Sequence, residues 1–310
     1  MLNSHSIFSG LYWVDDEPGF SIINEDGIEV GYAISSGQYI SMSLGKERYC
    51  TGYYDDTLAK RTACKNSSKT SNIGPVQCFY CKQKDRAFAA KTGIANTWYD
   101  SELLASKHVV YLALFGENPI PKIGVTRYDR FSNRIHEQGA WAAATILSSD
   151  GNSARRVERE LHHSFGFPEA VRLDSKLSQI CDILDEKVAE KILLTVVDNI
   201  NKRHIKNIDV RVNQFIYSYR DFGIRQTNVG NTIKLVTSFD LNFEMTGEIV
   251  GIVGKVILIS SNHETYAINT KLLEGYVTTN LLITDIPSLR GALSTFQVKV
   301  ININKQARLF

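Results

Sequence analysis

The hydrophobic and polar positions follow a period of two in the first part of the chain and again in the last. Up to about residue 100, short runs rich in β-branched and aromatic residues (FSIIN, IEVGYAIS, YISMSL) alternate with turn residues. Similar runs return after about residue 209, in IKLVTSFDL, EIVGIVGKVILISS, TYAIN and STFQVKVINI. Alternation of this kind is typical of β-strands. Gly247, Gly251 and Gly254 lie within the second set, where glycine marks a bulge or a tight barrel corner.

The middle of the chain has the pattern of a small unit of strands and helices. Two β-like runs, HVVYLALFG and PKIGVT, precede three stretches with helical patterning, over residues 130–147, 154–165 and 177–201. The last stretch is the clearest, because its apolar residues recur at steps of three and four, which predicts one buried face. These residues are Ile180, Ile183, Leu184, Val188, Ile192, Leu193, Val196 and Ile200.

We therefore predict an α+β protein in three parts. Residues 1–100 form a zinc-stabilised β-rich region, for reasons given below, and residues 101–206 form a small antiparallel sheet with helices. Residues 207–310 form a small C-terminal β-barrel or sandwich. A chain of 310 residues is long enough for two or three compact units.

Composition indicates a folded protein and limits its partners. Hydrophobic residues make up 43% and charged residues 22% of the chain, near the averages of soluble globular proteins. The sequence has neither a leader pattern nor an apolar run long enough to cross a bilayer, so we expect a cytoplasmic protein. A net charge of +2 gives no overall attraction to nucleic acid, so such binding must come from local clusters. Two clusters are either nucleic-acid contacts or solvated faces: Lys82, Lys84, Arg86 and Lys91, and Lys122, Arg127, Arg130 and Arg134.

Four of the five cysteines fall close together in the sequence. Cys78 and Cys81 form a Cys-x-x-Cys knuckle, while Cys50 and Cys64 lie further apart. In a cytoplasmic chain this grouping favours a metal over disulfides, and four thiolates suit a tetrahedral Zn²⁺ ion. Such a site has no open ligand position, so we expect it to stabilise the fold. A redox pair and unmetallated buried thiols are the alternatives. Cys181, on the apolar face of the last helix, is expected to be a core thiol.

A second group of residues, singled out by the family resemblance that follows, has the chemistry of phosphodiester hydrolysis, which needs an activated water and positive charge beside the phosphate. Glu158 can hold one Mg²⁺ (or Mn²⁺), with waters and the substrate phosphate completing the ligand shell. Arg134 can present its planar fork to phosphate oxygens, and Lys122 can supply a second positive charge. Tyr111 can orient the attacking water, and His162 can act as a ligand or base unless it is simply exposed.

The segment 109–165 resembles the catalytic core of the GIY-YIG nuclease superfamily. Tyr111 matches the tyrosine of the first half-motif, and residues 122–124 (KIG) match the second. Arg134 matches the family arginine, and Glu158 matches the metal-binding glutamate. The match is to the subgroup with KIG and a later helix that reads Ala-x-x-x-Glu-x-x-Leu-His. The resemblance implies that Tyr111, Arg134 and Glu158 meet in one pocket.

The segment departs from the family at several positions. Val109 and Val110 stand where the family has glycine and isoleucine, and Asn199 and Asn201 are only candidates for its asparagine. A degenerate core that binds nucleic acid without cutting it is therefore an alternative. Beyond about Tyr49 the chain also resembles a prokaryotic family that joins a four-cysteine element, this central segment and a β-rich tail, which implies architecture alone.

These observations predict a metal-dependent endonuclease that acts on nucleic acid, with DNA favoured over RNA and no membrane partner. Its rivals are a zinc-containing nucleic-acid-binding protein with a degenerate core and an RNA-processing nuclease that uses the same residues. The expected nucleic-acid contacts are Arg127, Arg130 and Arg155. Trp141 joins them as a base-stacking platform, or else it is a core anchor.

Overall fold

The computed structural model describes residues 6–55, 61–72, 74–85, 98–115, 121–180, 184–203, 208–217, 232–239, 243–285, 292–293 and 296–302. Arg86, Lys91 and Cys181, which were singled out in the sequence, lie outside these residues. The chain divides into two compact units. Unit 1 comprises Met1–Phe88 and Phe222–Asn302, and unit 2 comprises Ala89–Asp221 and Ile303–Phe310. Within the described residues, none of the helices has the length and apolar character needed to span a membrane.

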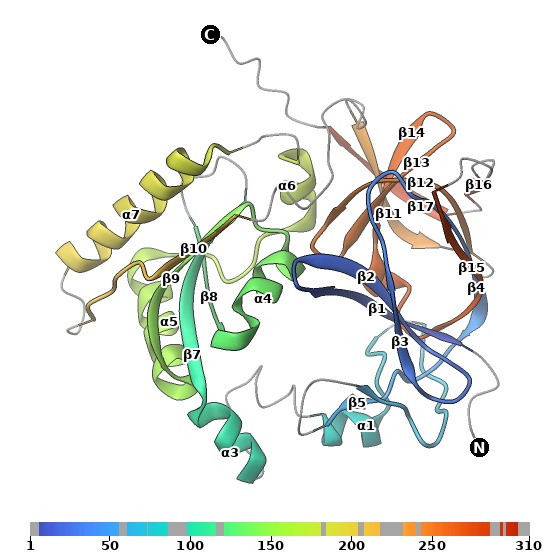
Figure 1. Ribbon diagram of the computed structural model, residues 1–310, viewed down its shortest axis with the longest axis horizontal. Helices are drawn as coiled ribbons and strands as arrows, with labels where there is room; N and C mark the ends of the chain where they lie inside the picture. Colours follow the sequence, from blue (N-terminus) through green and yellow to red (C-terminus); the bar gives the residue numbers. More distant parts are fainter. Residues whose placement is uncertain are drawn as a thin grey trace. The chain divides into compact units, whose positions relative to one another are not determined.

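Unit 1 is built on a large sheet (Figure 1). Over the described residues this sheet has 11 strands in the order β17-β11-β14-β13-β12-β4-β15-β1-β2-β3, and β16 pairs with β12. The strands are β1 Ile7–Val14, β2 Glu17–Ile23, β3 Glu29–Ala33, β4 Tyr39–Arg48, β11 Thr232–Phe239, β12 Glu244–Val253, β13 Val256–Ser261, β14 Glu264–Asn269, β15 Tyr276–Thr284, β16 Ala292–Leu293 and β17 Phe296–Asn302.

The first and last parts of the chain share this sheet. Strand β4 pairs with β12, where Met42 lies opposite Met245, and with β15, where Ile40 lies opposite Ile283. From the sequence these parts were predicted to be separate regions, with a β-barrel or sandwich of its own at the C-terminus, whereas in the structure their strands join one sheet. Alternation along a strand shows which side chains are buried, but it does not show which distant strand is the partner.

The hairpin of β12 and β13 explains the glycines in its sequence. The register shifts between Ile249 and Gly251, which marks a β-bulge, and Gly254 turns the chain with a φ of 62°. A Cβ at Gly247 would lie 2.4 Å from the carbonyl oxygen of Ser260. The prediction that glycine marks a bulge here is therefore confirmed at Gly251, and the close approach at Gly247 is a further finding.

Unit 2 has a four-stranded sheet in the order β10-β9-β7-β8 with helices on both faces. Helices α5 and α7 cover the core that contains Val110 and Leu112, whereas α4 covers the opposite face, which contains Val109 and Tyr111. This alternation along one strand is expected of a sheet that is buried on both sides. The elements are α3 Trp98–Ala105, β7 Lys107–Leu114, β8 Lys122–Arg127, α4 Phe131–Gln138, β9 Ala142–Asp150, α5 Gly151–Phe165, α6 Leu173–Ser178, α7 Glu186–Lys202 and β10 Gln214–Tyr217.

One of the three predicted helices is confirmed, and two need correction. Helix α5 includes the predicted 154–165. The prediction of one helix over 130–147 is wrong, because α4 ends before Gly139, whose φ of 66° is left-handed, and residues 142–150 form β9. The alanine-rich run favours a helix by propensity, but pairing with both β7 and β10 makes it a strand. In the stretch 177–201 the continuous helix begins only at α7, where Asp185 accepts hydrogen bonds from two backbone N–H groups.

Candidate functional site

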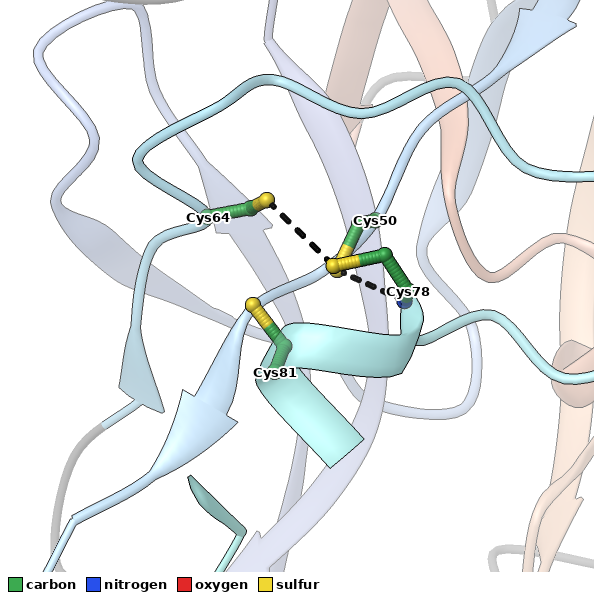
Figure 2. A group of neighbouring side chains, drawn as sticks. All are labelled: Cys50, Cys64, Cys78 and Cys81. Carbon is green, nitrogen blue, oxygen red and sulfur yellow. Dashed lines mark hydrogen bonds between the residues drawn. The ribbon is translucent and has the colours of Figure 1, made fainter. Parts of the chain in front are cut away.

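The four clustered cysteines of unit 1 come from three short segments. Cys50 follows β4 and Cys64 follows β6 (Arg61–Thr62), while Cys78 and Cys81 lie at the start of α1 (Phe79–Lys84). Their sulfur atoms all lie within 4.8 Å of one another, and Figure 2 shows the four side chains converging. Among the described residues this is the group of His, Cys, Asp and Glu side chains arranged to hold a metal ion.

The surroundings of these sulfurs suit a tetrahedral metal. Cys50, Cys64 and Cys81 are buried, and the sulfurs of Cys64 and Cys78 are 3.9 Å apart. With metal–sulfur bonds of about 2.3 Å, tetrahedral geometry separates neighbouring sulfurs by about 3.8 Å. The backbone N–H groups of Cys78 and Gly52 donate to the Cys50 sulfur at 3.2 and 3.4 Å. The donor set therefore fits Zn²⁺.

The pKa is raised for two of the thiols and lowered for a third, and burial is the main cause of the raised pKa of Cys81. Burial raises the pKa of Cys50 to about 11. Although burial opposes it, hydrogen bonds from Cys81 and Cys50 lower the pKa of Cys78 to about 7. Four thiolates at this spacing would repel one another, and a divalent cation would offset that repulsion by binding as the thiols lose their protons.

Gly52 fixes the chain beside Cys50. Its φ of 79° is in the left-handed region, and a Cβ there would lie 1.9 Å from the carbonyl oxygen of Thr62. Only glycine allows this close approach between the hairpin strands β5 (Tyr53–Tyr54) and β6. The same residue supplies an N–H group to the Cys50 sulfur, so the local fold and the sulfur environment depend on one glycine.

In unit 2, Tyr111 and Gly124 lie opposite each other on β7 and β8. Tyr111 is 1% exposed, and its ring centroid lies 5.7 Å from that of Phe131 on α4. Its hydroxyl oxygen accepts a hydrogen bond of 2.5 Å from the side-chain amide of Gln138. The absence of a side chain at Gly124 leaves the space that the phenol occupies, since a Cβ there would lie 2.4 Å from the Tyr111 oxygen.

Lys122 interacts with both Tyr111 and Glu158. Its Nζ lies 5.5 Å from the centroid of the Tyr111 ring, and its charge acts on the Glu158 carboxylate. Burial raises the pKa of Glu158, against the opposing effects of Lys122, Arg155 and a hydrogen bond from the backbone N–H of Val125. The carboxylate from α5 therefore lies beside β8, at the end of the strand order, where Lys122 is also found.

Arg134 has a different neighbour from the one the resemblance implied. Its guanidinium lies 3.6 Å from the carboxylate of Glu137, which also accepts a hydrogen bond of 2.7 Å from Arg130. Helix α4 carries Arg134 together with Phe131, which packs on Tyr111, but the charge of Arg134 is directed to Glu137. Lys122 thus lies near the Tyr111 ring and interacts electrostatically with Glu158, whereas the two predicted arginines pair with one carboxylate. Tyr111 itself lies on the face of the sheet that α4 covers, and Glu158 belongs to α5, which covers the opposite face.

The remaining expected residues have varied surroundings. The Nδ1 of His162 forms a hydrogen bond of 2.5 Å with the carbonyl oxygen of Phe167, which fixes the ring at the end of α5. Arg127 pairs with Asp129, and burial lowers the pKa of Arg155. Trp141 is 7% exposed, so the prediction that its ring stacks on a nucleic-acid base is wrong. The ring is a core anchor.

Three polar neighbours of this site were not predicted. Gln138 holds the Tyr111 hydroxyl, and its own side-chain carbonyl oxygen is buried with no hydrogen-bond partner among the described residues. Glu137 neutralises the two arginines, and Glu169 contributes to the raised pKa of Glu158. The sequence RIHEQGA contains Glu137 and Gln138 next to the family arginine, but one sequence alone does not distinguish them from ordinary polar helix residues.

The fold and site define a mixed α+β protein, mostly sheet, with a four-cysteine cluster. A family model described as "Protein of unknown function (DUF2797)" matches residues 37–278. The match covers more than half of the chain, so the chain belongs to this family, and it includes both the four cysteines and the strands β7, β8 and β9. No curated protein and no solved structure matches the chain.

Proposed function

We propose that the protein is a metal-dependent nuclease that hydrolyses phosphodiester bonds in DNA at the site of Tyr111, Lys122 and Glu158. The observation that carries the proposal is the position of Lys122, whose ammonium group lies 5.5 Å from the Tyr111 ring and acts on Glu158. Through this one cation the site combines a carboxylate that can hold a metal ion with a phenol that can orient water, and both suit hydrolysis of a phosphodiester.

The environment of Glu158 supports a role as metal ligand. Its pKa stays raised although Lys122 and Arg155 both favour the charged form, so desolvation of the carboxylate is not fully compensated. Mg²⁺ or Mn²⁺ bound there would neutralise charge on the phosphate and activate water, with waters and phosphate oxygens as its other ligands.

The chain's own residues have distinct tasks in this proposal. The Gln138 amide donates to the Tyr111 oxygen, which leaves the phenolic proton to orient a water or a phosphate oxygen. Lys122 supplies positive charge beside the scissile phosphate. The guanidinium groups of Arg134 and Arg130, which pair with Glu137, would bind phosphate oxygens of the substrate in place of that carboxylate.

The four-cysteine cluster belongs to the same proposal as a structural zinc site. Four cysteine sulfurs would fill the tetrahedral shell of a zinc ion, so the ion would have no open coordination position for a substrate. The zinc would hold α1 and the hairpin of β5 and β6 in place, and it would not take part in hydrolysis.

A non-catalytic nucleic-acid-binding protein is a second candidate. It is favoured by the burial of Tyr111 and by the pairing of Arg134 with Glu137, because both groups must become accessible for catalysis. Both candidates predict that the protein binds nucleic acid, and only the first predicts that it cleaves nucleic acid.

Incubation of the purified protein with plasmid DNA, single-stranded DNA and RNA separates them. Each substrate is tested with Mg²⁺, with Mn²⁺ and with a chelator, and the products are resolved on denaturing gels. The proposal predicts metal-dependent cleavage of DNA, whereas binding without cleavage under every condition supports the second candidate. Cleavage of RNA alone contradicts the choice of DNA.

A further inference from the structure

The knuckle between Cys78 and Cys81 presents two aromatic side chains to solvent. Phe79 is 77% exposed, the highest value among the large hydrophobic side chains of the described residues, and Tyr80 is 44% exposed. Exposed aromatic rings are unfavourable in water, so a pair of them on one short segment indicates a binding surface. We call Phe79, Tyr80, Lys82 and Lys84 the knuckle surface.

The backbone that carries these rings is fixed at both ends. Cys78 and Cys81 enclose Phe79 and Tyr80, and their side chains point into the four-sulfur cluster (Figure 2). Cys81 is buried, whereas the residues on either side of it in α1 are exposed. The rings are therefore held outward before a ligand arrives, and little conformational entropy is lost on binding.

Positive charge surrounds the rings. Lys82 and Lys84 are exposed on α1, and Nζ of Lys84 lies 4.5 Å from the Tyr80 ring centroid and 5.8 Å from that of Tyr53. Asp85 is the one acidic residue in 74–85, and it accepts a hydrogen bond from Gln77. Cations beside aromatic faces match a ligand that has both flat rings and negative charge.

We propose that the knuckle surface binds single-stranded DNA, with an unpaired base stacked on Phe79 and neighbouring phosphates beside Lys82 and Lys84. Bases within a duplex have their faces covered, so a projecting phenyl ring can reach a base face only in a single strand. The two lysines match the charge of a phosphate backbone, and the exposed residues of α1 include no carboxylate that would repel it. The choice of DNA rests on the proposed function, while the stacking depends on this surface alone.

The test is fluorescence anisotropy of a labelled oligothymidylate titrated with the full-length, zinc-loaded protein in the absence of Mg²⁺ and Mn²⁺. Phe79→Ala is expected to weaken binding about tenfold, because stacking of a base on an aromatic ring typically contributes about that factor. Phe79→Trp should keep the affinity, and Phe79→Leu should lose it as Ala does, since leucine has no π face. Tyr32→Ala on β3 is the matched control, because Tyr32 is an aromatic of unit 1 that is 43% exposed.

The outcomes separate this inference from the proposed function. The inference is overturned if Phe79→Ala binds the oligonucleotide as tightly as the parent, or if Phe79→Leu binds it as tightly as Phe79→Trp. It is also overturned if the parent binds a duplex of the same length with equal affinity. Binding to anionic vesicles in place of the oligonucleotide overturns it as well, and a preference for the RNA of the same sequence overturns the choice of DNA. Zinc content is measured for each variant. If Phe79→Ala loses zinc, the test depends on the comparison of Phe79→Leu with Phe79→Trp. Cleavage is assayed separately, so single-strand binding without hydrolysis contradicts only the proposed function.

Discussion

Tyr111 lies over Gly124 across the strand pair β7 and β8, with its phenol in the space where any other residue at 124 would place a Cβ. Gly124 is therefore required for a steric reason, because the Tyr111 phenol occupies the space beside it. We expect Gly124→Ala to lower the free energy of unfolding by about 1–3 kcal/mol, since Cβ would lie 2.4 Å from the Tyr111 oxygen. Urea denaturation measures this change.

A glycine in the large sheet provides the control for that substitution. Gly45→Ala on β4 places its Cβ 3.3 Å from Cβ of Val277, which requires a much smaller adjustment. Equal losses of stability in the two variants would contradict the steric role of Gly124.

Glu137 determines how much positive charge α4 offers to a phosphate. Because Arg130 and Arg134 both pair with it, Glu137→Gln should release two cations and raise the affinity for DNA several-fold at low salt, with a steeper salt dependence. Arg130→Ala should have the opposite effect and should act on all sequences alike. Anisotropy titrations at a series of salt concentrations measure both slopes, and an unchanged slope in Glu137→Gln would argue against phosphate contacts at this helix.

The four-cysteine cluster should hold about one zinc ion per chain, because four thiol ligands close one tetrahedral site. Cys81→Ser replaces a buried ligand, and we expect loss of the metal together with a fall in Tm of about 10 °C or more. Elemental analysis and thermal unfolding with and without chelator measure these effects. Full zinc content in the Cys81→Ser variant would exclude the site as described.

The raised pKa of Glu158 also has a consequence for stability. The folded protein holds the proton on this carboxyl more tightly than the unfolded chain does, because burial disfavours the charged form. Its contribution to stability is therefore fully present below the unfolded pKa and is lost as pH rises through the folded pKa. Glu158→Gln cannot ionise, so its stability relative to the parent should increase over that rise in pH. Thermal unfolding of both proteins in metal-free buffers from acidic to neutral pH checks this, and a constant difference would refute the assignment.

Short-range features of the fold were predictable, and long-range pairings were not. Local patterning predicts helix α5, and ligand chemistry predicts the cysteine cluster. The antiparallel strands that place Tyr111 opposite Gly124 were expected from the resemblance to the nuclease core. The pairing of Met42 with Met245 was not predictable, since the strands read alike and lie far apart in the sequence. Strand β9 was mistaken for a helix because its position in the sheet outweighs the helix propensity of alanine.

Prediction of the candidate site was limited in the same way. The order of the motifs gives Tyr111, Lys122 and Glu158 as candidates, but it does not contain the competing carboxylate of Glu137 or the amide that binds the phenol. Those roles depend on side-chain directions along α4, which the sequence specifies only once the strands beside the helix are known.

Cleavage of DNA by Glu158→Gln in the presence of Mg²⁺ tests the central claim most directly, with Glu160→Gln on the same helix as the matched control. The account predicts that Glu158→Gln loses turnover by several orders of magnitude and keeps its DNA affinity within a few-fold, because the substitution preserves shape and removes the charge that holds the metal. Glu160→Gln should cleave like the parent. A Glu158→Gln protein that cleaves as fast as the parent would contradict the account.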